Sequence, residues 1–421
     1  MKILIIHNCH RSGSVSGDDQ VFINETKLLE SHGNTVIRYT VSNDEFDRAK
    51  LNHKILQVLG MIWSKKHYRA VQTLIQTYHP DVVHIHTFFP LLSPSVLYAA
   101  KDTGLPVVAT LHDTRFICPA ATSLRKETLC NECMDGHYFR MYRYRCFKGS
   151  RIQSFIVACA FTYHRRKRSF YRQIDRYICL NDTQINLLKQ AGFDQNKIVK
   201  KYNFYPDNEI RECRETPFSV LLPERFVLFF GRIGIEKGIR ILEKAWEQLD
   251  IPLVVMGTGP LEDEFREWSK KHPLVQYIGY KEHEEALAIV KKSDIVVFPS
   301  IWYEGCSMVE IEAEGLGKPL IASDLGFSAE LVQPGYNGLK VKVGNPEALT
   351  EAVQELWIDP ARCKEMGKNA RADFEARFRK DENYRQLMKI YSDLCRMPME
   401  EIHEKQSVTG NRKAKETGIG H

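Results

Sequence analysis

Two glutamates with a fixed spacing stand where a strand is expected to give way to a helix. Glu304 and Glu312 have seven residues between them and follow the apolar run Ile295–Pro299, which is typical of a buried parallel strand. We expect a helix from about Cys306 to Gly315, with Glu304 just before it and Glu312 two turns inside it. A helix N-terminus offers free N–H groups to an anion such as a diphosphate, and flanking carboxylates can accept hydrogen bonds from sugar hydroxyls. The arrangement suits a nucleotide-sugar site, and the alternative is two surface glutamates on an amphipathic helix.

A second group of charged residues follows another expected strand. Arg232 and Lys237 lie in Phe230-Gly-Arg-Ile-Gly-Ile-Glu-Lys-Gly238, between the strand and a helix. A guanidinium can grip a phosphate with two hydrogen bonds, and an ammonium acts as a point charge. The alternative is a solvated basic loop.

Together these two patterns resemble glycosyltransferase family 4 (group 1), the retaining transferases with the GT-B fold. Glu304 and Glu312 match the family's Glu-x7-Glu, and Arg232 and Lys237 match its Gly-Arg-x4-Lys-Gly. The resemblance implies that Arg232 and Lys237 bind the donor diphosphate, while Glu304 holds the sugar ring and Glu312 the ribose. The donor-binding residues that we expect are Gly17, Arg232, Lys237, Tyr280, Glu304, Gly305, Cys306, Ser307, Met308 and Glu312.

The first half of the chain also carries a residue that matches the family. His112 ends an expected strand in Thr110-Leu-His-Asp113, where the family has a histidine near the donor sugar and phosphate. We expect His112 and Glu304 to be the catalytic residues, although a packed strand-end histidine is the alternative for His112. Asp-x-Asp does not occur at a plausible donor position, so we expect no cofactor for catalysis, and a diphosphate neutralised by cations and a helix dipole.

Four cysteines gather within one segment of the first half: Cys118, Cys130, Cys133 and Cys146. Cys130 and Cys133 form a C-x2-C pair. Four thiolates in a reducing compartment suit tetrahedral zinc, so we expect a small structural zinc site rather than free thiols, although the spacing is not that of a standard finger.

A strongly basic segment follows the cysteines. Between Arg140 and Arg176 there are eleven Lys or Arg residues and one acid, Asp175, and Arg151–His164 has apolar residues at helical spacing. A helix with an apolar face and dense cations suits an anionic membrane surface. A helix packed on its own domain is the alternative, and we expect no nucleic-acid partner because the aromatic residues are not arranged as in an RNA-binding motif.

Length and composition agree with a globular protein of two domains. The chain has 421 residues, 43% of them hydrophobic and 27% charged, and no apolar stretch approaches the ~20 residues of a membrane span. The start reads as a first strand rather than a signal peptide, so we expect a cytoplasmic protein, placed at the inner face of the plasma membrane if the basic helix binds there.

Short apolar runs alternate with amphipathic segments, which predicts parallel α/β layers. We expect two Rossmann-like, doubly wound domains that face each other across a cleft, as in the GT-B fold. The expected segments are an acceptor domain (1–205, with a cysteine-containing insertion at 118–146), a linker (206–223), a donor domain (224–378), a helix returning to the first domain (379–396) and a disordered tail (397–421).

These expectations favour one activity: transfer of a sugar from a UDP- or GDP-linked donor to a glycan or polyprenyl-linked acceptor, with retention, in cell-surface polysaccharide biosynthesis. Two alternatives remain open, a nucleotide-sugar epimerase of GT-B architecture and a non-catalytic scaffold of the same fold. The donor sugar and base, the acceptor and the linkage are not encoded in these motifs.

Overall fold

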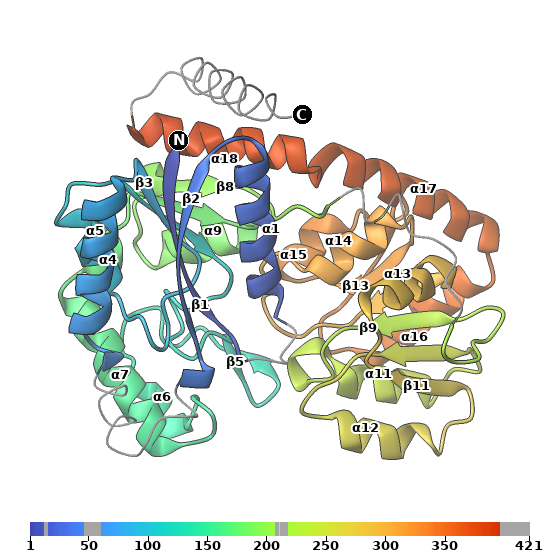
Figure 1. The fold of residues 1–421 in the computed structure, drawn as a ribbon. Coiled ribbons are helices and arrows are strands. Elements are labelled where there is room, and N and C mark those ends of the chain that lie inside the picture. The colour runs from blue at the N-terminus through green and yellow to red at the C-terminus, as the bar shows by residue number, and fades with distance from the viewer. Residues whose placement is uncertain (12–15, 46–59, 207–209, 211–217, 396–421) are drawn as a thin grey trace, which may run out of the picture.

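The computed structural model of the chain describes residues 1–11, 16–45, 60–206, 210 and 218–395 (Figure 1). The expected tail, 397–421, and most of the expected linker, 206–223, lie outside the described residues.

The first half forms a parallel sheet with the strand order β2-β1-β3-β4-β7-β8. Its strands are β1 (Lys2–Cys9), β2 (Thr35–Ser42), β3 (Val82–Ile85), β4 (Val107–Leu111), β7 (Arg176–Cys179) and β8 (Ile198–Lys200). Between them run α1 (Gly17–Ser31), α4 (Lys65–Tyr78), α5 (Ser95–Lys101), α6 (Arg140–Tyr144), α7 (Arg151–Arg166), α8 (Ser169–Arg172), α9 (Asp182–Gln190), the 3-10 turn η1 (Gln195–Lys197) and the hairpin of β5 (Leu124–Arg125) and β6 (Thr128–Leu129).

The second half forms another parallel sheet, in the order β11-β10-β9-β12-β13-β14. Its strands are β9 (Val227–Phe230), β10 (Leu253–Met256), β11 (Val275–Gly279), β12 (Ile295–Phe298), β13 (Leu320–Ser323) and β14 (Gly338–Val341). Its helices are η2 (Ile235–Lys237), α11 (Ile239–Trp246), α12 (Glu262–Ser269), α13 (His283–Lys292), α14 (Met308–Gly315), α15 (Gly326–Leu331), α16 (Pro346–Trp357), α17 (Pro360–Arg377) and α18 (Lys380–Cys395).

Burial on both faces explains why the central strands are apolar throughout. In β1, Ile3 and Ile5 join one hydrophobic cluster, while Leu4 and Ile6 join the cluster on the opposite face. Alternate residues of a strand point to opposite faces, so a central strand covered by helices needs apolar residues at every position.

The chain passes between the two halves twice, and the two crossing segments are neighbours in space. The Tyr205 amide donates to the Phe378 carbonyl at 3.2 Å, so the outgoing and returning segments lie side by side. Beyond this point α18 runs back over the first domain, in line with α17 (Figure 1). There Tyr384 accepts from Asn34 at 3.0 Å, and the Tyr391 hydroxyl lies 2.7 Å from His84 Nδ1.

Several elements differ from the sequence predictions. The strands β8, β11 and β14 were not predicted, because these strands have partly buried residues and lack a fully apolar run. Helix α14 begins at Met308 rather than at about Cys306, so Glu312 lies little more than one turn inside it, and the prediction of two turns was wrong.

Candidate active site

Glu304 lies in the loop between β12 and α14, almost fully buried. Its Oε1 atom accepts from Lys237 Nζ at 2.7 Å and from Ser300 Oγ at 2.8 Å. The side chain is 7% exposed, so the pairing with Lys237 compensates most of the cost of burying a carboxylate. Glu304 is therefore held in one position, as a residue that orients a sugar would need to be.

The two expected diphosphate ligands occupy different environments. Lys237 ends η2, pairs with Glu304 and places its ammonium 5.5 Å from the centre of the Trp302 ring. The Arg232 side chain is 61% exposed and makes an ion pair with Glu236 at 3.2 Å. Arg232 is thus the more accessible of the two cations, whereas Lys237 is committed to a buried contact with Glu304.

Gly231, which follows β9 and precedes Arg232, lies very close to the loop after β10. Gly257 has a φ of 137°, and a Cβ there would lie 1.8 Å from the Gly231 carbonyl oxygen. Only glycine fits this contact. The Gly-Thr-Gly sequence at 257–259 therefore packs against the loop that carries Arg232.

Four further expected donor residues lie just before α14 or within it. Cys306 is buried, and its carbonyl accepts from Asn203 at 3.3 Å. Ser307 is the N-cap residue of α14, but its side chain makes no capping hydrogen bond, and Met308 is the first helical residue. Glu312 is half-buried on α14.

Two expected donor residues are open to solvent. Tyr280 follows β11 and is 52% exposed. Gly17 is the first residue of α1, where a Cβ would meet no atom within 4 Å. Among the described residues, no hydrogen bond or ion pair joins either one to Glu304.

The first domain reaches the Glu304 loop through His112 and Asn181. A Cβ at Gly305 would lie 2.7 Å from the His112 carbonyl oxygen, too close for any side chain. Asn181, at the end of β7, donates from Nδ2 to the carbonyls of Glu304, at 2.8 Å, and Gly305. The structure thus brings the Glu304 loop against the backbone of His112 across the two domains, and the catalytic roles of both residues stay predictions.

Asparagine is a common N-cap residue, and Asn181 directly precedes α9. It does cap α9, since its Oδ1 accepts from the Gln184 amide at 2.8 Å. The side-chain amide is therefore shared between a cap within its own domain and the donor loop of the other domain. No local pattern distinguishes this asparagine from an ordinary cap.

His112 is held by its ring as well as by its backbone. Its Nε2 atom lies 3.0 Å from His86 Nδ1. Burial, followed by the effect of the nearby His7, lowers the pKa of His112 to about 3, so the imidazole is neutral at physiological pH.

Glu310 is a second buried carboxyl group of this site, and the sequence prediction missed it. It is 1% exposed, its Oε1 accepts from Ser328 Oγ at 2.5 Å, and its Oε2 has no hydrogen-bond partner. Burial, reinforced by the charge of Glu304, raises the pKa of Glu310 to about 8. A neutral Glu310 leaves the negative charge of the site on Glu304.

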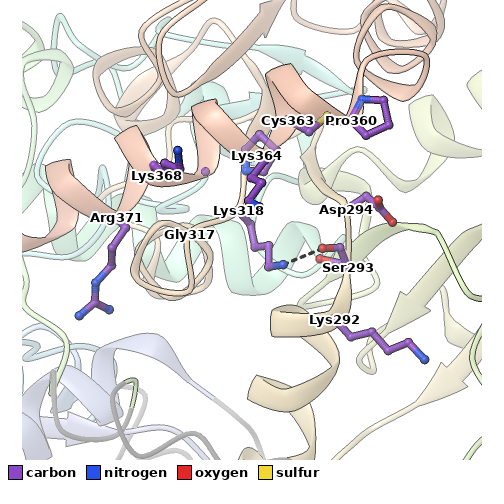
Figure 2. Close-up of a pocket in the computed structure, with 12 residues that line it drawn as sticks. Lys292, Ser293, Asp294, Gly317, Lys318, Pro360, Cys363, Lys364, Lys368 and Arg371 are labelled. Atoms are coloured by element: carbon purple, nitrogen blue, oxygen red, sulfur yellow. Dashed lines mark hydrogen bonds between the residues drawn. The ribbon is translucent and has the colours of Figure 1, made fainter.

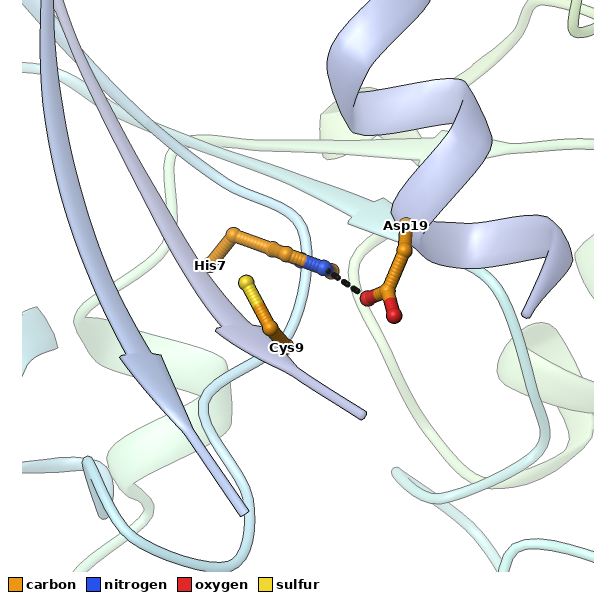
Figure 3. A group of neighbouring side chains, drawn as sticks. All are labelled: His7, Cys9 and Asp19. Carbon is orange, nitrogen blue, oxygen red and sulfur yellow. Dashed lines mark hydrogen bonds and ion pairs between the residues drawn. The ribbon is translucent and has the colours of Figure 1, made fainter. Parts of the chain in front are cut away.

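A group of polar side chains lies at the start of α1. Asp19 accepts from His7 Nε2 at 2.6 Å and from the His10 amide at 3.1 Å, and Cys9 lies beside them (Figure 3). Partial burial alone would raise the pKa of Asp19, but the hydrogen bonds from His10 and His7 outweigh burial and lower it. Asp19 is thus held by two histidines.

The four cysteines of the insertion influence one another electrostatically, and none of them forms a disulfide bond. Burial, together with the charges of the other three thiols, raises the pKa of Cys133 to about 12, and burial with its neighbours raises that of Cys146 to about 11. Zinc–sulphur bonds of about 2.3 Å would bring the sulphur atoms to roughly 4 Å from one another. Within the described residues, the groups of three or more ligand atoms that lie within 4.8 Å of one another are His7–Cys9–Asp19 and Glu25–His84–His86, so no three of the four thiols come this close together, and the zinc site stays a prediction.

The basic segment forms the helix α7, with its apolar face only partly covered. Ala158 and Phe161 are buried, whereas Ile152 is 75% and Phe155 is 47% exposed. Along the part of the chain that is described, we find no helix with the length and apolar character needed to cross a bilayer.

A separate pocket of about 630 Å³ lies between α17 and the amino ends of β12 and β13 (Figure 2). Its lining includes Lys318, whose Nζ donates to the Ser293 carbonyl at 2.8 Å, and Lys364 and Lys368 of α17. It opens at the amino ends of β12 and β13, whereas Glu304 follows the carboxyl end of β12. Ligands of parallel α/β sheets bind at the carboxyl ends, so this pocket is distinct from the candidate active site.

The fold is that of a GT-B glycosyltransferase, with two parallel α/β domains that are in contact where the Glu304 loop lies against Asn181 and the backbone of His112. The model of glycosyl transferases group 1 matches residues 215–373, and that of glycosyltransferase family 4 matches residues 20–208. The chain therefore belongs to glycosyltransferase family 4 (group 1).

Individual relatives agree with this assignment. An uncharacterized glycosyltransferase of Methanocaldococcus jannaschii is 25% identical over 329 residues, which are 78% of this chain and 79% of that protein. The O-antigen chain mannosyltransferase C of Escherichia coli is 22% identical over 406 residues, 94% of this chain and 99% of that protein. The crystal structure of Anabaena HepE in complex with UDP and glucose superposes with a TM-score of 0.63 at 19% identity, covering 93% of this chain and 100% of that chain.

Proposed function

We propose that this glycosyltransferase transfers a sugar, with retention, from a UDP- or GDP-linked donor to a glycan or polyprenyl-linked acceptor of a cell-surface polysaccharide. The observation that carries the proposal is the buried Glu304–Lys237 pair beside the uncapped start of α14, with His112 against the same loop. The likeness to an O-antigen mannosyltransferase and to a structure containing UDP and glucose supports the classes of acceptor and donor.

The residues suggest how the charge of the leaving group is balanced. Arg232 and the N-terminus of α14 bind the diphosphate, and Lys237 bridges the diphosphate and Glu304, which holds the sugar. The bond between the anomeric carbon and the phosphate oxygen breaks, and the acceptor oxygen bonds to the same face of that carbon. The departing phosphate takes the proton of the acceptor hydroxyl, so the reaction needs neither a covalent nucleophile nor a metal ion.

Donor binding is tested first by thermal shift of the purified protein with UDP, GDP, ADP and their sugar conjugates. We expect one nucleotide to raise the melting temperature in the wild type and not in Arg232→Ala. Arg362→Ala, which removes a partly exposed arginine on α17, is the matched control and should respond like the wild type. If none of these nucleotides stabilises the wild type, the scaffold alternative is favoured.

Transfer is tested with the nucleotide sugar identified in this way. Conversion of the donor to an epimer without any acceptor would identify the epimerase alternative instead. Proton NMR of the first-formed glycoside reports retention or inversion at the anomeric carbon, and an inverted product contradicts the proposed mechanism. Glu304→Ala should abolish transfer while the fold remains intact.

We further propose that the protein docks on the inner face of the plasma membrane through α6 and α7. Phe139 and Tyr142 are 47% and 43% exposed and lie 5.8 and 5.9 Å, between ring centres, from Phe155, while Ile152 extends the apolar surface. The same two helices and the turn between them carry the cations Arg140, Arg143, Arg145, Lys148 and Arg151. Aromatic residues surrounded by cations suit an anionic lipid surface.

Sedimentation with lipid vesicles tests this surface. The protein should bind phosphatidylglycerol vesicles and not phosphatidylcholine vesicles, and Ile152→Ser with Phe155→Ser should abolish binding. Ile358→Ser is the control, because Ile358 is 82% exposed on the other domain. Equal binding by the double variant and the wild type contradicts the proposal.

A further inference from the structure

A buried chain of polar side chains leads from the core of the first domain to His112. Glu25 on α1 is 2% exposed, and its Oε1 lies 3.1 Å from Nε2 of His86, which follows β3. His86 Nδ1 lies 3.0 Å from His112 Nε2. Glu25, His86 and His112 therefore form a continuous line of hydrogen bonds from the core to the site.

The charge of Glu25 is already balanced by another buried group. Lys201 Nζ lies 3.3 Å from Glu25 Oε2 and donates to Asn383 Oδ1 of α18 at 3.0 Å. Burial alone would raise the pKa of Glu25, but Lys201 and the two neighbouring histidines outweigh it and hold that pKa well below its usual value. Glu25 is thus a carboxylate, and His86 can remain neutral beside it.

An ionised carboxylate can only accept hydrogen bonds, and this decides the direction of the whole chain. His86 must donate from Nε2 to Glu25, so neutral His86 carries a lone pair on Nδ1. His112 must then donate from Nε2 to His86, which leaves the lone pair of neutral His112 on Nδ1.

The ring geometry agrees with a hydrogen bond between His86 and His112. The centres of the His86 and His112 rings are 5.2 Å apart, and the planes are inclined by 18°. Two ring nitrogens are only 3.0 Å apart, so the rings meet edge to edge in nearly one plane. This is the plane in which a ring N–H and a ring lone pair point.

We propose that Glu25 and His86 are positioning residues that fix His112 as the Nε2–H tautomer, so that His112 Nδ1 accepts a hydrogen bond from a hydroxyl group of the bound sugar or acceptor. The role of the accepting atom rests on the proposed transferase function, but the tautomer does not. His112 would then discriminate in favour of a ligand that presents a hydroxyl group, rather than a phosphate oxygen, at this position.

The tautomer is measured directly in the protein without ligand. Long-range proton–nitrogen NMR of the chain labelled with 15N-histidine separates protonated ring nitrogens from those with a lone pair, and His112→Gln assigns the signals. We expect a protonated Nε2 and an unprotonated Nδ1 for His112. A protonated Nδ1, in either the neutral or the cationic ring, overturns the proposal even if no transferase activity has been found.

Two variants of His86 test the consequence for turnover. The side-chain amide of His86→Gln can donate to Glu25 and accept from His112, whereas His86→Leu can do neither. Loss of one hydrogen bond at the site corresponds to about a tenfold effect. We therefore expect His86→Leu to lower kcat about tenfold or more with donor affinity within about threefold of the wild type, and His86→Gln to restore most of kcat.

The comparison separates positioning from folding. If His86→Leu does not fold, the tautomer of the wild type and the kcat of His86→Gln still show whether His86 positions His112. A His86→Leu protein that is folded and turns over at the wild-type rate refutes the positioning role. Equal losses in His86→Gln and His86→Leu refute it as well, because the hydrogen-bond pattern would then be irrelevant.

Discussion

Glu310→Gln removes a buried carboxyl group beside Glu304 whose pKa is strongly raised, and the substitution keeps the shape of the side chain. The pKa of Glu310 rises from the ordinary 4.5 to about 8 because the side chain is buried next to Glu304. At pH values between 4.5 and about 8, Glu310 keeps its proton in the native state and has lost it in the unfolded state. The native state therefore loses stability as the pH rises, and the loss begins above about pH 4.5 and ends near pH 8.

The magnitude follows from the pKa shift. One pKa unit corresponds to about 1.4 kcal/mol, so the contribution of Glu310 falls by about 2–3 kcal/mol between pH 5.5 and 7.5. Glutamine does not titrate, so the variant should gain that amount relative to the wild type over this range. Other titrating groups are common to both proteins and cancel in the difference.

Urea unfolding at pH 5.5, 6.5 and 7.5, followed by tryptophan fluorescence, measures this difference. Glu351→Gln is the control, because Glu351 is exposed on α16 and its curve should stay parallel to the wild type. A stability difference between Glu310→Gln and the wild type that does not change with pH would refute the reasoning. Glu310 would then be ionised in the native state.

Three further predictions concern the contact between the domains and the insertion. Gly305→Ala should lower kcat by at least about tenfold, because its Cβ would lie 2.7 Å from the His112 carbonyl and displace the Glu304 loop, and wild-type turnover would contradict this. Asn181→Ala removes a helix cap and the hydrogen bonds to that loop, so the unfolding free energy measured in urea should fall by about 2–4 kcal/mol, and a change below 1 kcal/mol would disagree. If the insertion binds structural zinc, metal analysis of the purified protein should find about one zinc ion per chain, lost in Cys133→Ser, whereas a metal-free, stable protein would favour free thiols.

The motifs with local signatures were predicted from the sequence. Buried parallel strands require continuous apolar runs, so the central strands of both sheets could be recognised, whereas the GT-B architecture followed from the resemblance of the Glu304 and Arg232 motifs to a known family. The same holds for Glu304, which lies between an apolar strand and a helix, and for Lys237 after the strand β9. These features depend on residues that are close in the sequence, where periodicity and spacing carry the information.

Tertiary structure alone decided which polar groups act together. Glu25 and His86 are 61 residues apart, and Asn181 and Glu304 are 123 residues apart, so no spacing pattern links either pair. Glu310 and Glu312 are two positions apart on one helix, yet Glu310 is buried against Ser328 and Glu312 is only half-buried. The sequence by itself determined the elements and the chemical groups available to them. Burial determined the protonation states, since desolvation and the identity of the neighbouring charges exist only after the two sheets and their helices have packed.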